Sequence, residues 1–471
     1  MSSAPATQPS DSPGKPVPGP GAGPASVLTL LLAYSFLSWF NRVSMSVAGA
    51  EQIIPGGLLN ETRMGDIYSI LVVTYTLCMI PGGWLADRAG PRTALLLMGL
   101  GSAAFVAMTG VAGGIMVAGT GLYVGLLAAR GLMGAFTAPI YPAAGRVVSL
   151  EVPAHRLAEA NGLIMGAALV GIAAAPFAFG QLIDWFRWPS AFVVMGLVTA
   201  ALAIAWAMAT ARRPLKEFDS DALHPLWDTH LDAGTSSVAA GADPTLSLGR
   251  LLGQRSLLFL ALAYVFIGYY ENLFFFWSQY YFKDVMELGK NTSRAYTTLL
   301  YLAMALGMFA GGRLADRLGR STGVRTARLL VAAAGLLAGA VFLSVALSAG
   351  LNQPRLVVGS LALALAAVGI CEGPLWTMAI EAGGRRGATA GAIFNTGGNF
   401  GGVFSPAVTP RVATAFGWTC AVGLGVAACV IAVIFLAFVE REPKSVTERG
   451  GEFQPRIGHD DLVTAGENPP Q

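Results

Sequence analysis

Residues 83–92 read GWLADRAGPR, and residues 312–320 read GRLADRLGR. Each copy lies between two apolar runs, and Asp87 and Asp316 are 229 residues apart (316 − 87), about half of the chain. A repeat at this interval indicates a duplicated half-protein, because solenoid modules repeat every 20–50 residues. In both copies an apolar segment ends where charged residues begin, as expected where a helix leaves a membrane. The sequence therefore predicts two related halves, each with a charged turn at the membrane surface.

The composition is that of a polytopic membrane protein. Of the 471 residues, 54% are hydrophobic and 12% are charged, whereas about 25% are charged in an average soluble domain. The net charge of +3 gives no reason to expect nucleic-acid binding. The four cysteines lie in apolar runs and the four histidines lie outside them, so we expect no disulfide framework, no metal site and no cofactor.

The apolar runs predict an all-α membrane protein of twelve transmembrane helices in two six-helix bundles. A run of about 20 apolar residues is needed to cross the hydrocarbon layer. Runs of this length occupy residues 26–48, 65–86, 94–113, 119–147, 159–182, 188–210, 256–282, 295–315, 324–349, 356–381, 387–414 and 418–439. We therefore expect an N-terminal bundle over residues 26–210 and a C-terminal bundle over 256–440.

Three polar segments frame these bundles. Residues 1–25 are rich in proline, glycine and serine, which predicts a disordered tail with no signal peptide. Residues 211–255 form a predicted cytoplasmic linker, and residues 441–471 a predicted cytoplasmic tail.

The basic residues predict the orientation. Most of the 30 lysines and arginines fall in the tails, the linker and loops on the same side as the two charged turns. Because basic residues accumulate on the cytosolic side, we expect both termini in the cytosol of a cell whose inner, or plasma, membrane holds the chain. The predicted outer loops carry Arg63, Arg187, Lys283, Lys290, Arg294, Arg355 and Arg411.

Four ionisable residues lie deep within predicted spans: Arg42, Arg130, Glu271 and Glu372. Charges at such depth are costly unless they are paired or face water, so each is a candidate for function. The two arginines lie in one half and the two glutamates in the other, which favours a water-filled cleft between the halves. The alternative is a pair of internal Arg–Glu salt bridges that only hold the halves together. Paired arginines in a cavity would select a small organic anion, because a guanidinium keeps its charge and donates a forked pair of hydrogen bonds.

Both charged turns resemble the signature loop between the second and third helices of each half in the major facilitator superfamily. This resemblance covers residues 26–440 and implies a secondary transporter whose halves rock around a central site. It assigns the gating role at the cytosolic side to Gly83, Asp87, Arg88, Arg92, Gly312, Asp316, Arg317 and Arg320.

A narrower resemblance is carried by the N-terminal half. Residues 41–48, NRVSMSVA, are similar to the first-helix motif of the anion:cation symporter branch, and residues 130–134, RGLMG, are similar to its fourth-helix motif. This implies uptake of sugar acids or other small carboxylates, driven by protons or sodium. It makes Arg42 and Arg130 the predicted substrate-binding arginines.

The chain departs from that branch at two positions. Asn41 replaces an aspartate and Thr137 replaces a glutamate, so the branch's proton carriers are missing. Glu271 is related to Arg42 by the 229-residue repeat, and Glu372 aligns with Thr137. Since a glutamate held away from water takes up a proton more readily, Glu271, Glu372 or both are predicted to carry the coupling proton. They could instead bind an amine on a zwitterionic substrate.

Further polar side chains within the spans suit a hydroxylated solute. We select Tyr34, Tyr75, Asn395 and Asn399 as additional substrate-binding candidates. The sequence thus predicts a monomeric proton-coupled symporter of a small organic anion, and no enzyme, because the spans lack a histidine and any nucleophile–base pair. A proton-driven exporter and a transport-derived sensor are the alternatives, although residues 171–180 match the exporters' fifth-helix motif poorly.

Overall fold

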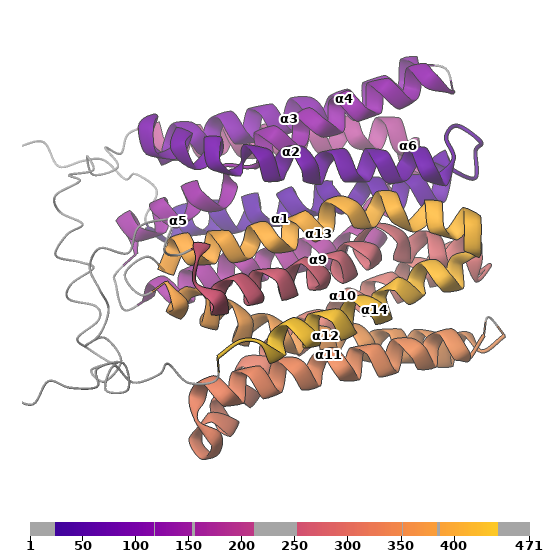
Figure 1. Ribbon diagram of the computed structural model, residues 1–471. Coiled ribbons are helices and arrows are strands. Elements are labelled where there is room, and N and C mark those ends of the chain that lie inside the picture. Colours follow the sequence, from indigo (N-terminus) through magenta and orange to yellow (C-terminus); the bar gives the residue numbers. More distant parts are fainter. Residues whose placement is uncertain are drawn as a thin grey trace, which may run out of the picture.

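The computed structural model describes residues 24–440, apart from 117, 153–155, 212–251, 351 and 384–386. Most of the predicted tails and linker lie outside these residues. The described part consists of helices joined by short turns, and Figure 1 shows the helices aligned along one common axis as a bundle. This confirms the predicted all-α membrane fold.

Six chain segments build the N-terminal half. They are α1 (Pro24–Ala48), which continues as the π-helix η1 (Gly49–Ile53), α2 (Glu61–Arg88), α3 (Pro91–Ile115), α4 (Thr120–Thr137), α5 (Ile140–Glu151) and α6 (Leu157–Ala211). The predicted fourth span is broken between α4 and α5, where Pro139 interrupts the helix. The fifth and sixth spans are continuous as α6, and the chain reverses at Arg187, whose φ is 61°.

Six segments likewise build the C-terminal half. They are α9 (Arg255–Tyr280), which continues as the π-helix η5 (Tyr281–Val285), α10 (Lys290–Thr322), α11 (Val324–Ser348), α12 (Pro354–Ala382), α13 (Gly387–Phe416) and α14 (Trp418–Ala437). Within the described ranges, nine helical stretches are long and apolar enough to cross a membrane. With α6 counted as two passes, and α1 and α13 added, these give the twelve predicted spans.

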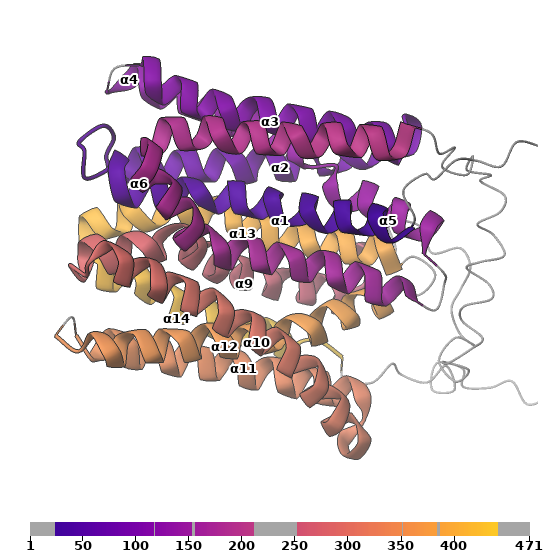
Figure 2. The ribbon, with the colours of Figure 1, turned by 180° about the vertical axis from the view of Figure 1, so that it is seen from behind.

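The halves meet along matching helices. The N-terminal α1, α2 and α6 contact α9, α13 and α10, and Figures 1 and 2 both show α1, α13 and α9 in the middle of the bundle. Within each half, the same helix contact is repeated. Helix α1 packs on α6 at Gly171, and α9 packs on α13 at Gly401. At either glycine a Cβ atom would lie within 2.3 Å of a backbone oxygen of the partner helix, so only glycine permits these approaches.

The two copies of the charged turn have different structures. In the first copy α2 ends at Arg88, Gly90 adopts a φ of 80°, and Pro91 begins α3. In the second copy α10 continues through Asp316 and Arg320 and ends only before Gly323. In each copy the helix ends before a glycine with a positive φ, Gly90 or Gly323, and this glycine comes later in the second copy. The predicted end of the second span at residue 315 is therefore too early.

Candidate functional site

The four charged residues predicted within the membrane lie on four different helices, two in each half. Arg42 lies on α1, Arg130 on α4, Glu271 on α9 and Glu372 on α12. Arg42, Arg130 and Glu372 are only 4%, 1% and 5% exposed, so in this conformation the arginines do not face the water-filled cleft that we expected. Among the described side chains, neither arginine forms a salt bridge with either glutamate, which contradicts the alternative of two internal ion pairs.

Arg42 is held by aromatic rings. Its guanidinium carbon lies 4.2 Å from the ring centre of Trp39 and 4.4 Å from that of Tyr75. The indole N–H of Trp39 donates a 2.6 Å hydrogen bond to the Tyr141 hydroxyl, which fixes this ring. Cation–π contacts stabilise a cation without neutralising it. Arg42 therefore has no acidic partner among the described residues, and its charge remains available to an anion.

Arg130 is bound to the backbone of α1. Its Nη2 donates to the carbonyl oxygens of Asn41 (3.2 Å) and Arg42 (3.0 Å), and its Nη1 donates to that of Asn41 (3.2 Å). Its Nη1 also contacts the Met133 sulfur at 3.1 Å. Most of its donors are thus used within the protein, directly beside Arg42. This geometry suits a residue that positions α1 more than one that contacts a solute.

The two positions that lack the branch's acids form neutral hydrogen bonds within the N-terminal half, although the buried Oδ1 of Asn41 receives none. The Asn41 amide donates to the Thr199 hydroxyl at 3.0 Å. The Thr137 hydroxyl donates to the Met133 carbonyl at 2.7 Å and lies 3.2 Å from the Ser102 hydroxyl. Neutral hydrogen bonds have replaced titratable groups here, so this half has no proton carrier at either position.

Glu271 and Glu372 lie together in the C-terminal half. Their carboxyl groups are within hydrogen-bonding reach of each other. The Tyr264 hydroxyl donates to Oε2 of Glu372 at 3.0 Å and accepts from the indole N–H of Trp376 at 3.2 Å. Oε1 of each glutamate is buried without a hydrogen-bond donor. Two acids in contact make an arrangement that requires a proton or another cation.

The four other residues predicted to bind the solute do not all lie near Arg42. Tyr75 contacts Arg42, as described above. Asn399 and Asn395 are neighbours on α13, and the Asn399 amide donates to the Asn395 carbonyl at 3.1 Å and contacts the Met79 sulfur on α2 at 3.6 Å. Tyr34 instead packs on Trp206 of α6, with ring centres 6.0 Å apart, inside the N-terminal half. The structure thus brings Tyr75 to Arg42 and the two asparagines to the contact between the halves, but places Tyr34 elsewhere.

A charged cluster joins the halves at the end of the bundle opposite the charged turns, and we call it the Arg294 cluster. Arg294 on α10 donates from Nε and Nη2 to the two carboxylate oxygens of Glu51 on η1, at 2.7 and 2.5 Å. It also donates to Asp184 on α6, at 2.7 and 3.1 Å. Lys290 pairs with Asp184 at 2.5 Å, and the Gln279 amide donates to Glu51 at 3.1 Å. The side chains of Arg294 and Glu51 are 0% and 1% exposed.

The sequence did not reveal the Arg294 cluster. The sequence places Arg294 in a predicted outer loop, and Glu51 and Asp184 lie just past the ends of predicted spans in the other half. One signal in the sequence was that acidic residues follow predicted spans of one half while basic residues precede a span of the other half. This pattern does not predict a salt bridge, because the ends of membrane spans are commonly charged.

At the other end of the bundle, the described ion pairs join helices of the same half. Asp87 pairs with Arg146 of α5, and Arg328 pairs with Glu381 at 2.5 Å. Arg88 lies over the Trp84 ring, at 5.1 Å, and the carbonyl of Arg92 accepts from Trp206. The described cross-half salt bridges all belong to the opposite end: Arg294 with Glu51 and Asp184, Lys290 with Asp184, and Arg411 with Asp66. The two charged turns therefore do not latch the halves together in this conformation.

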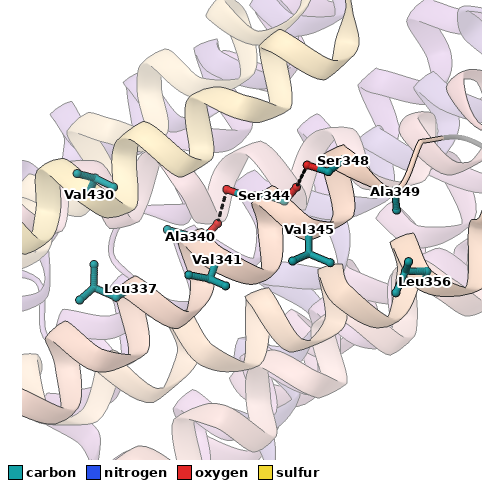
Figure 3. Close-up of a pocket in the computed structure, with 9 residues that line it drawn as sticks. All are labelled: Leu337, Ala340, Val341, Ser344, Val345, Ser348, Ala349, Leu356 and Val430. Atoms are coloured by element: carbon teal, nitrogen blue, oxygen red, sulfur yellow. Dashed lines mark hydrogen bonds between the residues drawn. The ribbon is translucent and has the colours of Figure 1, made fainter.

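A groove elsewhere on the molecule is unrelated to these charges. It has a volume of about 620 Å³ and lies between α11, α12 and α14. Figure 3 shows its nine lining residues, none of which is charged, with Ser344 and Ser348 bonded to carbonyls of their own helix. An apolar groove with partly exposed Leu337, Val341 and Leu356 suits the lipid-facing surface of a membrane protein.

Known proteins with similar sequences are membrane transporters. The chain is 25% identical to the "Probable sulfoacetate transporter" of Cupriavidus necator over 385 residues, which cover 81% of this chain and 85% of the relative. It is 26% identical to the "D-galactonate transporter" of Escherichia coli O6:H1, with 86% and 93% covered. It is also 26% identical to the "Probable galactarate/D-glucarate transporter" of Bacillus subtilis, with 83% and 86% covered.

Solved structures of transporters share the fold. A bacterial homologue of the human lysosomal transporter Spinster has a TM-score of 0.66 at 18% identity and covers 89% of this chain and 96% of its own. A D-xylose–proton symporter has a TM-score of 0.67 at 14% identity, with 88% and 98% covered. The family profile described as Major Facilitator Superfamily matches residues 27–393. The chain therefore belongs to the Major Facilitator Superfamily and is a membrane transporter, not an enzyme.

Proposed function

We propose that this transporter carries a small organic anion, a sugar acid or another small carboxylate or sulfonate, into the cell together with protons. It does so as a monomer in the inner membrane, with both termini in the cytosol. The observation that carries this proposal is Arg42, a buried cation that no acidic side chain of the described part neutralises. A buried charge without a counter-ion is costly, and binding of an anionic solute offsets that cost.

The surroundings of Arg42 support an anion with hydroxyl groups. The rings of Trp39 and Tyr75 hold the guanidinium, and its N–H groups suit the two oxygens of a carboxylate. Tyr75 lies against Arg42, Tyr141 is bonded to Trp39, and Asn395 and Asn399 are further polar groups on α13; we infer that these side chains bind the hydroxyls of a sugar acid once their present contacts rearrange. The relatives support the same class of solute, because their names specify sugar acids and a sulfonated carboxylate.

The contacts between the halves support transport by alternating access. Cross-half salt bridges gather at the end that carries Arg294, while the ion pairs described at the other end stay within one half. Opening the Arg294 end requires the loss of those cross-half bonds and new contacts at the end with Asp87 and Asp316. We infer that the residues of the charged turns make those new contacts in the opposite conformation.

Purified protein in proteoliposomes tests this proposal. With labelled D-galactonate as the first probe and D-glucarate and sulfoacetate as competitors, we expect counterflow exchange that the Arg42→Lys variant loses. The matched control is Arg355→Lys, because Arg355 is exposed at the start of α12 and should exchange solute normally. An acidic exterior should drive accumulation. Exchange that Arg42→Lys leaves intact would contradict the anion site, and accumulation driven only by an acidic interior would show an exporter.

A further inference from the structure

The contact between Glu271 and Glu372 is an unusual feature of the C-terminal half. Glu271 lies on α9 and Glu372 on α12, and their carboxyl groups are within hydrogen-bonding reach of each other. Glu372 is 5% exposed. One Oε1 oxygen on each residue is buried and receives no hydrogen bond. Two neighbouring carboxyl groups, each with a buried acceptor oxygen that receives no hydrogen bond, indicate that a small cationic ligand belongs between them.

The groups around the pair do not supply that positive charge. The titratable side chains that act on the two carboxyl groups are Tyr264 on α9 and Cys371 on α12, with Cys429 of α14 next to Cys371. Trp376 and Phe394 complete the surroundings, and the Phe394 ring stacks on Tyr264 at 4.0 Å. No lysine, arginine or histidine acts on the pair in the part of the chain that the structure describes.

We propose that Glu271 and Glu372 bind one proton between them and form the proton site of this transporter. Two carboxylates in contact away from water cannot both be ionised. A proton on one acid supplies the missing donor, and the hydrogen bond runs to the free oxygen of the other. The proton comes from water on the side to which the site opens and is released to water on the opposite side, so no further reactant is needed.

Tyr264 positions this pair. Its hydroxyl donates to Oε2 of Glu372, while Trp376 donates to that hydroxyl and fixes its direction. One oxygen of Glu372 is thereby occupied, and the remaining oxygen is left for the proton shared with Glu271. Tyr264 acts through Glu372, so it is a positioning residue for the proton site.

The site also explains how coupling survives in this chain. In the N-terminal half, Asn41 and Thr137 are neutral and hydrogen-bonded within that half. The acid pair in the other half provides a titratable site in their place. The role in coupling rests on the proposed function, whereas the shared proton is a property of the protein alone.

Infrared difference spectroscopy of the purified full chain, without any solute, tests the shared proton. A titration of the wild type should show the C=O band of one protonated carboxyl group that Glu271→Gln and Glu372→Gln each remove completely. Tyr264→Phe should shift the band and leave it present. Glu287→Gln is the matched control, because Glu287 is exposed and its replacement should leave the band unchanged.

Three results would overturn the inference. They are a band that each single glutamine variant only halves, no band at all, and a band displaced at constant pH by sodium or methylamine. The last result would assign the pair to a metal cation or to an amine. Because no solute is present, failure here leaves the Arg42 test untouched. If both glutamine variants remove the band but the wild type does not exchange D-galactonate, the result would contradict only the proposed function.

Discussion

The guanidinium of Arg294 forms a two-pronged salt bridge with the carboxylate of Glu51, and the two residues belong to different halves of the transporter. The bonds are 2.7 and 2.5 Å long, and both side chains are almost fully buried. Since Asp184 binds the same guanidinium, one arginine ties α10 to both η1 and α6. The Arg294 cluster is therefore the main polar lock at this end of the bundle.

Removal of the Arg294 side chain should open this end. Arg294→Ala leaves the buried carboxylate of Glu51 without its cation, and breaking a buried pair in this way costs about 3–5 kcal/mol. Spin labels at Pro55 and Phe416, in a background without the native cysteines, should report a longer distance than in the parent. Arg411→Ala is the control, because its cross-half bond to Asp66 is half exposed and such pairs contribute about 0–1 kcal/mol. Equal distances in Arg294→Ala and the parent would refute the lock.

Substitution of a glycine should open the same end without removing a charge. At Gly180 an added Cβ would lie 2.2 Å from Nε of Arg294, so Gly180→Ala should displace the guanidinium from Glu51. The same pair of spin labels should again move apart. Gly166→Ala on the same helix is the control, because the space beside Gly166 is open. If both variants behave alike, the position of Arg294 does not control this end.

Arg130 should support solute binding indirectly, because it holds the part of α1 that carries Arg42. Arg130→Lys keeps the charge but cannot donate to both the Asn41 and Arg42 carbonyls as the guanidinium does. We expect a lower melting temperature, since hydrogen bonds from charged groups contribute about 1.5–3 kcal/mol. Solute affinity should weaken but persist. Complete loss of binding with an unchanged melting temperature would show that Arg130 contacts the solute directly.

Trp39 should maintain the position of Arg42 through its ring. Trp39→Phe keeps an aromatic face beside the guanidinium, whereas Trp39→Leu removes it. Cation–π contacts contribute about 0.5–2 kcal/mol, so Trp39→Leu should weaken binding of D-galactonate by roughly 2- to 30-fold relative to Trp39→Phe. Tyr141→Phe separates the effect of the hydrogen bond between Trp39 and Tyr141. Equal affinities in the leucine and phenylalanine variants would exclude a role for the ring.

Much of the fold was predictable because hydrophobic length and repetition are local properties. The twelve spans follow from apolar runs, and the 230-residue interval between Gly171 and Gly401 corresponds to equivalent helix contacts in the two halves. The second charged turn was mispredicted because its likeness to the first lies in the residues LADR. The following residues decide where the helix ends: Pro91 disfavours a helical backbone at Gly90 in the first copy, whereas the helix of the second copy continues to Thr322, before Gly323.

The candidate site was predictable in its charges but not in its contacts. Depth in a span identified Arg42, Arg130, Glu271 and Glu372, yet sequence alone could not separate an arginine that lies over rings from one that is bonded to a backbone. Residue type alone makes Tyr34 a candidate, whereas its packing on Trp206 depends on the rotation of α1 about its axis. Arg294 was missed because its partners come from η1 and α6, far away in the sequence.

A structure of the transporter with a bound solute tests the anion site most directly. With D-galactonate, or another solute that passes the exchange assay, we expect the carboxylate oxygens about 2.7–2.9 Å from the guanidinium nitrogens of Arg42. Trp39 and Tyr75 should remain beside the guanidinium. A solute bound elsewhere, with Arg42 still lying over its two rings and touching no anion, would contradict the account.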